Sequence, residues 1–131
     1  MTFDYSQEIF KEWTIVKGIK FLRKLENETA FDGVIKIYSI QTDNDKLNEI
    51  LKGLYFGTIG HKTTNGILLR QFLNKNSWPK TMLVFLDISN FNLTVVNKTN
   101  SSYQNWEIKE LTRGKYKINL TPTESVDFID I

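Results

Sequence analysis

The part of the chain after Pro79 constrains the fold most, because it consists of short segments with the residue pattern of strands. Four such segments occupy residues 81–88, 92–98, 106–111 and 115–120, and short polar links separate them. Strands at this regular spacing are typical of consecutive antiparallel pairing. The sequence therefore predicts a C-terminal four-strand meander.

The region before Pro79 predicts three short helices, because apolar residues recur there at helical spacing. The first begins at Ser6 and ends near Gly18, a typical C-terminal stop. The second begins at Asp45, after polar residues that suit a helix start. The three predicted helices occupy residues 6–18, 45–55 and about 65–74.

The stretches between these helices complete the predicted architecture. Residues 19–25 and 34–40 have strand-like patterns and predict a hairpin, whereas the glycines of residues 56–66 predict a loop. We expect one α+β domain over residues 1–131, with three short helices, an antiparallel sheet, an N-terminal hairpin and the C-terminal meander. The acidic tail, residues 121–131, is expected to be frayed or docked along an edge or against the basic region.

The residue types exclude several kinds of site. The chain has no cysteine and one histidine, so disulfides, thiolate metal sites and a histidine-rich metal centre are excluded. We expect no cofactor and no metal, although an oxygen-only site for Mg²⁺ or Ca²⁺ stays open. The acidic N-terminus does not suit a signal peptide, and no apolar run approaches the roughly 20 residues that cross a bilayer. A soluble, cytoplasmic protein without a membrane partner is expected.

Positive charge is segregated between Ile50 and Leu86, although the whole chain carries a formal net charge of only +2. This region contains no Asp or Glu. Its basic residues are Lys52, His61, Lys62, Arg70, Lys75 and Lys80. Because a segregated field steers association, the pattern predicts a partner with an acidic surface.

The first functional hypothesis is stoichiometric binding of another protein without catalysis, as in an inhibitor, an immunity protein or an antitoxin. The basic region would meet the partner, and tryptophans would anchor the contact. The predicted binding residues are Lys62, Arg70, Lys75, Trp78, Lys80 and Trp106. The oligomeric state stays open, because an edge strand of the meander could pair with a second copy.

The alternative hypothesis is an RNA-binding protein or a small metal-independent ribonuclease that uses the loop around His61. This loop, residues 60–66, places a histidine, a lysine, two hydroxyls and an amide before a predicted helix N-terminus, where a phosphate is favoured. In the ribonuclease version His61 and Lys62 are catalytic, and Arg70 and Tyr55 supply further groups. The loop lacks the spacing of a P-loop, so the balance favours a protein that is not an enzyme.

Overall fold

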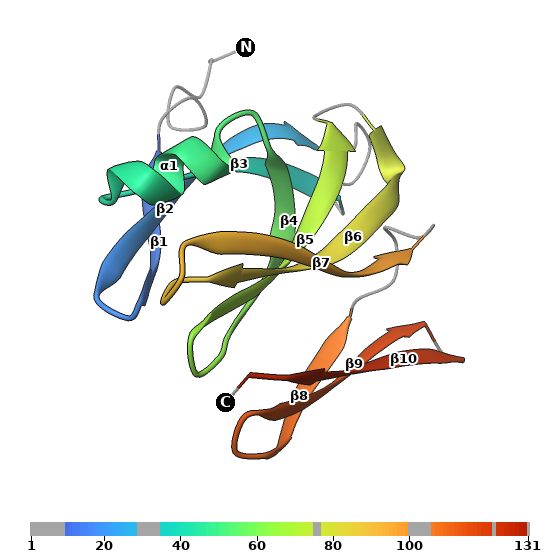
Figure 1. The fold of residues 1–131 in the computed structure, drawn as a ribbon. Coiled ribbons are helices and arrows are strands. Elements are labelled where there is room, and N and C mark those ends of the chain that lie inside the picture. Colours follow the sequence, from blue (N-terminus) through green and yellow to red (C-terminus); the bar gives the residue numbers. More distant parts are fainter. Residues whose placement is uncertain (1–9, 29–34, 75–76, 100–105, 122, 131) are drawn as a thin grey trace.

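Strands dominate the protein, and they form two antiparallel sheets (Figure 1). The computed structural model describes residues 10–28, 35–74, 77–99, 106–121 and 123–130, and only the backbone of residues 77–80 and 99. Within these ranges it contains ten strands and one short helix. The predicted α+β class with three helices is therefore wrong, since the described part of the chain is mostly β. No helix in these ranges is long and apolar enough to cross a membrane.

The larger sheet has seven strands in chain order, so that each strand pairs with the next one. Its strands are β1 (Lys11–Val16), β2 (Ile19–Glu28), β3 (Lys36–Thr42), β4 (Tyr55–Lys62), β5 (Gly66–Asn74), β6 (Ser77–Asp87) and β7 (Asn92–Thr99). The sheet curves strongly, and α1 (Asp45–Leu51) connects β3 to β4 (Figure 1). Leu47 and Leu51 of α1 are buried in the core that the curved sheet encloses.

The smaller sheet has three strands in the order β10-β9-β8. They are β8 (Glu107–Thr112), β9 (Lys115–Thr121) and β10 (Glu124–Ile129). Residues of β8, β9 and β10 share a buried apolar cluster with β5 and β6, so the smaller sheet covers the outer face of the larger one. Six residues of the acidic tail form β10 and are docked along β9.

Strand β5 is buried on both of its faces. Ile67 and Leu69 pack into the core inside the curved sheet, whereas Leu68 packs against the smaller sheet. The same alternation holds on β6, with Val84 and Leu86 inside and Leu83 and Phe85 outside. These two strands therefore join the two cores.

The helix predicted at residues 65–74 is wrong, because this segment is β5. A continuous apolar run fits a strand buried on both faces as well as it fits a buried helix, and periodicity cannot distinguish them. Gly66 begins the strand, and a Cβ there would overlap the carbonyl of Leu86 on β6. The second buried face, which packs against the smaller sheet, distinguishes the strand from a helix.

The helix predicted at residues 6–18 is also wrong, because residues 11–16 form β1. Residues 6–9 of this prediction lie outside the residues that the structure describes. Lys17 and Gly18 both have positive φ, at 48° and 81°. Two successive positive φ values are typical of a tight hairpin turn, and this turn joins β1 to β2. Gly18, interpreted as a helix stop, is thus a turn residue.

The predictions for the hairpin and the second helix are confirmed in part. β2 and β3 pair antiparallel, and α1 begins at Asp45, where the Asn44 side chain accepts a hydrogen bond from Leu47 N at 3.0 Å. The helix ends earlier than predicted, at Leu51. The loop predicted at residues 56–66 is largely β4. One of its glycines, Gly60, has a packing role, because a Cβ there would lie 2.5 Å from Trp13 Cζ2.

The strands predicted after Pro79 exist, but they do not form one meander. β6 and β7 complete the larger sheet, whereas β8 and β9 join β10 in the smaller one. Residues 100–105, between the two pairs, lie outside the described residues. The strand pattern identifies each segment, but it does not determine which sheet the segment joins.

Arg23 connects three strands of the curved sheet. Its guanidinium carbon lies 4.7 Å from the ring centre of Trp13 and 4.3 Å from that of Tyr38. Its Nη1 donates a hydrogen bond to the Thr58 carbonyl at 3.2 Å. Arg23 thus ties β1, β3 and β4 together from β2.

Replacing Arg23 with alanine is expected to lower the free energy of unfolding by about 1–2 kcal/mol, because both stacking contacts and the hydrogen bond are lost. Arg23→Lys keeps the charge but not the planar group, so it should recover less than half of the loss. Urea denaturation of the three proteins measures both values. If the lysine variant is as stable as the wild type, charge alone accounts for the contribution of Arg23.

Candidate binding surface

Two of the predicted binding residues, Arg70 and Trp106, pack against each other inside the protein. They are 7% and 6% exposed, and the guanidinium carbon lies 4.2 Å from the centre of the indole. Arg70 Nε also donates a hydrogen bond to Thr81 Oγ1 at 3.1 Å. Burial lowers the pKa of Arg70 to about 10, so the side chain remains a cation at neutral pH. The indole Nε1 has no acceptor among the described residues, and packing holds Trp106 in place.

Of the other predicted binding residues, only the side chain of Lys62 is among those that the structure describes. Lys62 is exposed, and its Nζ lies 3.5 Å from the Ile15 carbonyl oxygen. Lys75 lies outside the described residues, and of Trp78 and Lys80 only the backbone, part of β6, is described. The structure therefore separates Lys62 from Arg70 and Trp106.

His61 and Lys62 lie on opposite faces of the larger sheet. His61 is paired with Leu68, which faces the smaller sheet, whereas Lys62 is paired with Ile67, which faces the inner core. His61 packs edge-on against Tyr116, with ring centres 5.7 Å apart. A shared catalytic centre would need both side chains on one side, and the strand geometry prevents this.

The polar loop between β4 and β5 binds a carboxylate of the protein itself. Asp130 Oδ2 accepts hydrogen bonds from Thr63 Oγ1 and from Asn65 N, the latter at 2.8 Å. Asp130 Oδ1 accepts a third from Asn65 Nδ2 at 2.7 Å. These donors belong to the loop that predicts a phosphate site, and no helix begins after it. The chemistry of anion binding is present, but Asp130 is the anion.

A different surface combines apolar and basic side chains, on the outward face of the smaller sheet. Tyr116, Ile118 and Leu120 of β9 point inward, so the residues between them point outward. Leu111 and Ile129 are 61% and 63% exposed, more than any other large apolar side chain described. We call this surface the Leu111–Ile129 face, made of Leu111, Arg113, Lys115, Lys117 and Ile129.

The two apolar residues flank Lys115. Ile129 is the cross-strand partner of Lys115 on β10, and Thr112, which follows Leu111, is its partner on β8. Leu111 itself has no partner on β9, because the pairing shifts between Glu110 and Thr112. At this end of the smaller sheet, one exposed aliphatic side chain, Ile129, thus lies opposite Lys115, and the other, Leu111, precedes the partner of Lys115 on β8.

The charges of the Leu111–Ile129 face are largely uncompensated. Lys117 lies directly opposite Lys109 on β8, and like charges in such pairs destabilise a sheet. Lys109 forms an ion pair with Glu107 at 2.9 Å, and this hydrogen bond raises the pKa of Lys109. Among the described residues Arg113, Lys115 and Lys117 form no ion pair, although Asp127 lies opposite Lys117.

A shallow hollow adjoins the face at Lys117. It has a volume of about 330 Å³ and is lined by Lys117, Asn119, Thr121, Thr123, Glu124 and Ser125. Its lining is polar, so it suits hydrogen-bonding groups of a partner. In the described part of the chain no three His, Asp or Glu side chains gather so as to hold a metal ion.

The predicted basic region, residues 50–86, does not include this surface, although docking along an edge is among the expectations for the tail, residues 121–131. One signal could have found it. Lys115 and Lys117 alternate with Tyr116, Ile118 and Leu120, which predicts a basic outward face on that strand. The pairing of β10 with β9, which brings Ile129 to Lys115, has no such signal.

Comparison of the chain with family models, with curated proteins and with solved structures found no match in any of the three.

Proposed function

We propose that this protein acts by stoichiometric binding of another protein, without catalysis, and that the Leu111–Ile129 face makes the contact. This is the mode of action of inhibitors, immunity proteins and antitoxins. The observation that supports the proposal is the pair of highly exposed aliphatic side chains at one end of the smaller sheet, Ile129 opposite Lys115 and Leu111 next to the other partner of Lys115. Single exposed apolar residues are ordinary, whereas two at one end of a sheet, next to several cations, would together form the apolar centre of a contact.

The apolar pair supplies the driving force for association. Burying one exposed aliphatic side chain of this size contributes about 1.5–3 kcal/mol. Leu111 and Ile129 leave most of this contribution unused in the free protein, because both are more than half exposed. A partner with a hollow for aliphatic side chains would realise it.

The cations define the remaining chemistry of the partner. Arg113 follows Leu111 in the β8–β9 turn, Lys115 lies opposite Ile129, and Lys117 lies on the same face of β9, so carboxylates at the rim of the partner's hollow would meet these cations. Rim charges of this kind speed the encounter and select the partner more than they add affinity. We therefore expect a partner with an acidic rim and an apolar centre.

The same cations could meet nucleic acid, and the aromatic side chains argue against it. Binding of single-stranded RNA relies on exposed rings on which bases stack. Trp106, which precedes β8, and Tyr116 of β9 are buried, and Phe128 of β10 packs on Phe85 with ring centres 4.8 Å apart. Among the described residues the Leu111–Ile129 face has no aromatic ring, so a protein partner fits it better.

Affinity capture from lysate of the source cells tests the proposal, using wild-type protein and a Leu111→Ser/Ile129→Ser double variant. We expect the wild type to retain one protein in equimolar amount, with and without nuclease, and the double variant to retain less than a tenth of it. Leu73→Ser is the matched control, since Leu73 is 56% exposed and lies on β5, outside the face. It should capture as the wild type does.

Two outcomes would contradict the proposal. Equal capture by the double variant would show that the face is not the contact. Retained RNA that is lost in nuclease and falls steeply with salt would favour the nucleic-acid alternative, because each neutralised phosphate releases counterions.

A further inference from the structure

Strand β7 is the open edge of the larger sheet that carries the least charge. Edge strands offer unpaired backbone groups, and proteins protect them with charges, bulges or covering segments. The described strands leave four edges, at β1, β7, β8 and β10. The edges at β8 and β10 carry charged side chains along their length, and β1 carries two, Lys11 and Glu12, at its start.

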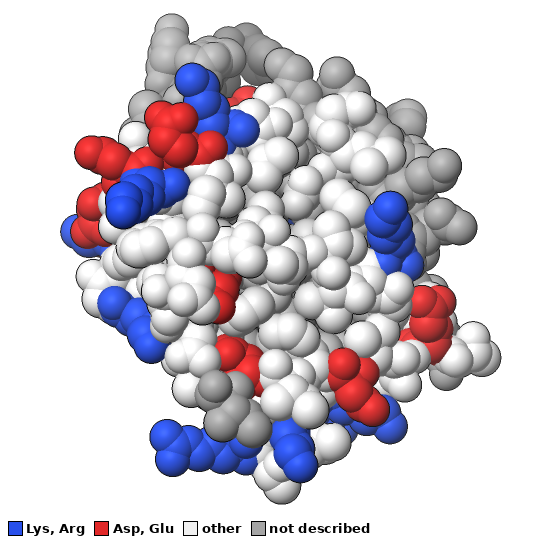
Figure 2. Space-filling view, viewed as in Figure 1, with Lys and Arg blue, Asp and Glu red and all other residues white. Residues whose placement is uncertain are grey.

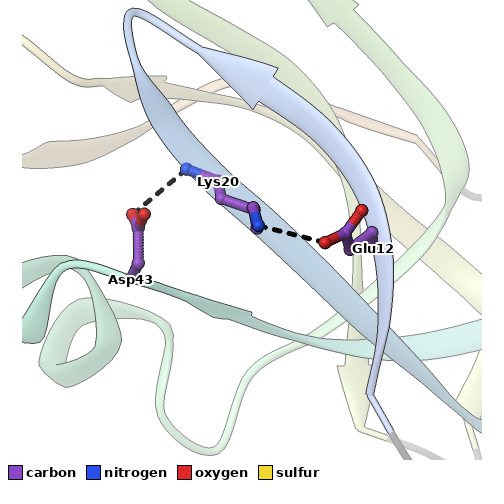
Figure 3. Close-up of polar contacts among 3 residues, drawn as sticks. All are labelled: Glu12, Lys20 and Asp43. Atoms are coloured by element: carbon purple, nitrogen blue, oxygen red, sulfur yellow. Dashed lines mark hydrogen bonds and ion pairs between the residues drawn. The ribbon is translucent and has the colours of Figure 1, made fainter.

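The edge at β1 is protected at its start, by charge and by an irregular register. Glu12 of β1 forms an ion pair with Lys20 Nζ at 3.0 Å, and the backbone N of Lys20 donates to Asp43 Oδ1 at 3.1 Å (Figure 3). The β1–β2 register also shifts between Glu12 and Thr14. On the smaller sheet, the charged edge residues are Glu107, Lys109 and Glu110 of β8, and Glu124 and Asp127 of β10.

Strand β7 has no charged residue from Asn92 to Asn97, and Lys98 lies near its end. Val95 is 53% exposed. Figure 2 shows the face over β7 as mainly uncharged, with most charged side chains around its margin. A bulge at Val96, where the pairing with β6 shifts, leaves Asn92–Val95 as a regular ladder edge.

We propose that β7 pairs antiparallel with β7 of a second copy of this chain. The occupant is a second copy because a two-fold axis needs only one patch, and an antiparallel strand edge complements itself. If the two-fold axis passes through Thr94, the Thr94 residues of the two copies face each other. Leu93 of each copy then faces Val95 of the other. Lys98 then lies opposite Asn90, so no like charges meet.

The side-chain directions agree with this register. Leu93 and Val95 are paired with Leu86 and Val84 of β6, both of which face the inner core. Leu93 and Val95 therefore share one face of the sheet, as cross-strand partners must. The contact would continue the curved sheet from one copy into the other and bury Val95.

Cysteine cross-linking tests the register, because the natural chain has no cysteine. Facing residues in an antiparallel pair have Cα atoms about 4.5–5.5 Å apart, within the range for a disulfide. Thr94→Cys should form a covalent dimer under mild oxidation at least tenfold faster than Ser125→Cys, an exposed residue on the β10 edge. Equal rates would overturn the proposed register.

Sedimentation over a wide range of protein concentration tests the dimer itself. We expect reversible dimers of the wild type, and a monomer at every concentration for Val95→Lys, which would place two cations beside the axis. Ile129→Lys is the control on the other surface and should dimerise as the wild type does. A monomeric wild type, or a Val95→Lys variant that still dimerises, would overturn the proposal. These results do not depend on the proposed protein partner.

Discussion

Gly66→Ala is expected to lower the free energy of unfolding by about 3 kcal/mol or more, the largest effect predicted for this protein. A Cβ at this position would overlap the carbonyl oxygen of Leu86 and lie 2.9 Å from its carbonyl carbon. These are backbone atoms of the neighbouring strand, so no rotamer change relieves the overlap. β5 and β6 would have to separate at the point where the two cores meet. Urea denaturation followed by tryptophan fluorescence measures the loss.

Gly18→Ala is the matched control. Position 18 also favours glycine, but the reason is its φ of 81° and not a lack of space. A Cβ there would meet nothing within 4 Å. The strain of that conformation costs about 1–2 kcal/mol. If Gly66→Ala destabilises the protein no more than Gly18→Ala does, the approach of β5 to β6 is not as rigid as described.

Asp130→Ala is expected to lower the free energy of unfolding by about 2–3 kcal/mol. The carboxylate accepts hydrogen bonds from Thr63 and twice from Asn65, and its backbone N donates to the Gly114 carbonyl at 2.7 Å. It therefore holds the end of β10 against the β4–β5 loop. Without it, three donors lose their acceptor in a site that is 7% exposed. Asp127→Ala, on the same strand but exposed, should change stability by less than about 0.5 kcal/mol.

The contribution of Asp130 should also depend on pH. Burial by itself would raise the pKa of Asp130, but the hydrogen bonds from Thr63 and Asn65, with Lys17 nearby, outweigh it and hold the pKa below its usual value. The folded state therefore favours the ionised form. The contribution is fully present above the unfolded pKa of about 3.9, and it is lost as pH falls through the lower folded value.

Comparison of the wild type with Asp130→Asn, which does not titrate, isolates this dependence. The difference in unfolding free energy between the two proteins should be constant from neutral pH down to about pH 5 and shrink below it. A difference that stays constant into strong acid would show that the charge of Asp130 does not stabilise the loop.

The candidate site shows where reasoning from residue types reaches its limit. The loop around His61 was interpreted as an anion site, and its donors do bind an anion. That anion lies 65 residues away from Asn65 in sequence, at Asp130. Spacing within the loop indicates what the loop can bind, but not that the chain itself occupies it. In the same way, Arg70 and Trp106 were candidates for an exposed contact, and they pack on each other instead.

Local pattern determined most of the strands after Pro79, the β2–β3 hairpin and the start of α1, because turn residues, caps and alternation act over a few neighbouring residues. Tertiary structure alone decided that residues 66–74 are a strand, since only the second buried face on the smaller sheet distinguishes it from a helix. It also decided that β8 belongs to the smaller sheet and does not pair with β7, and that the pairing of β10 with β9 places Ile129 opposite Lys115. The backbone hydrogen bonds between two strands are nearly the same whatever their side chains are. Which strands pair is therefore decided by how the side chains of the whole chain pack together.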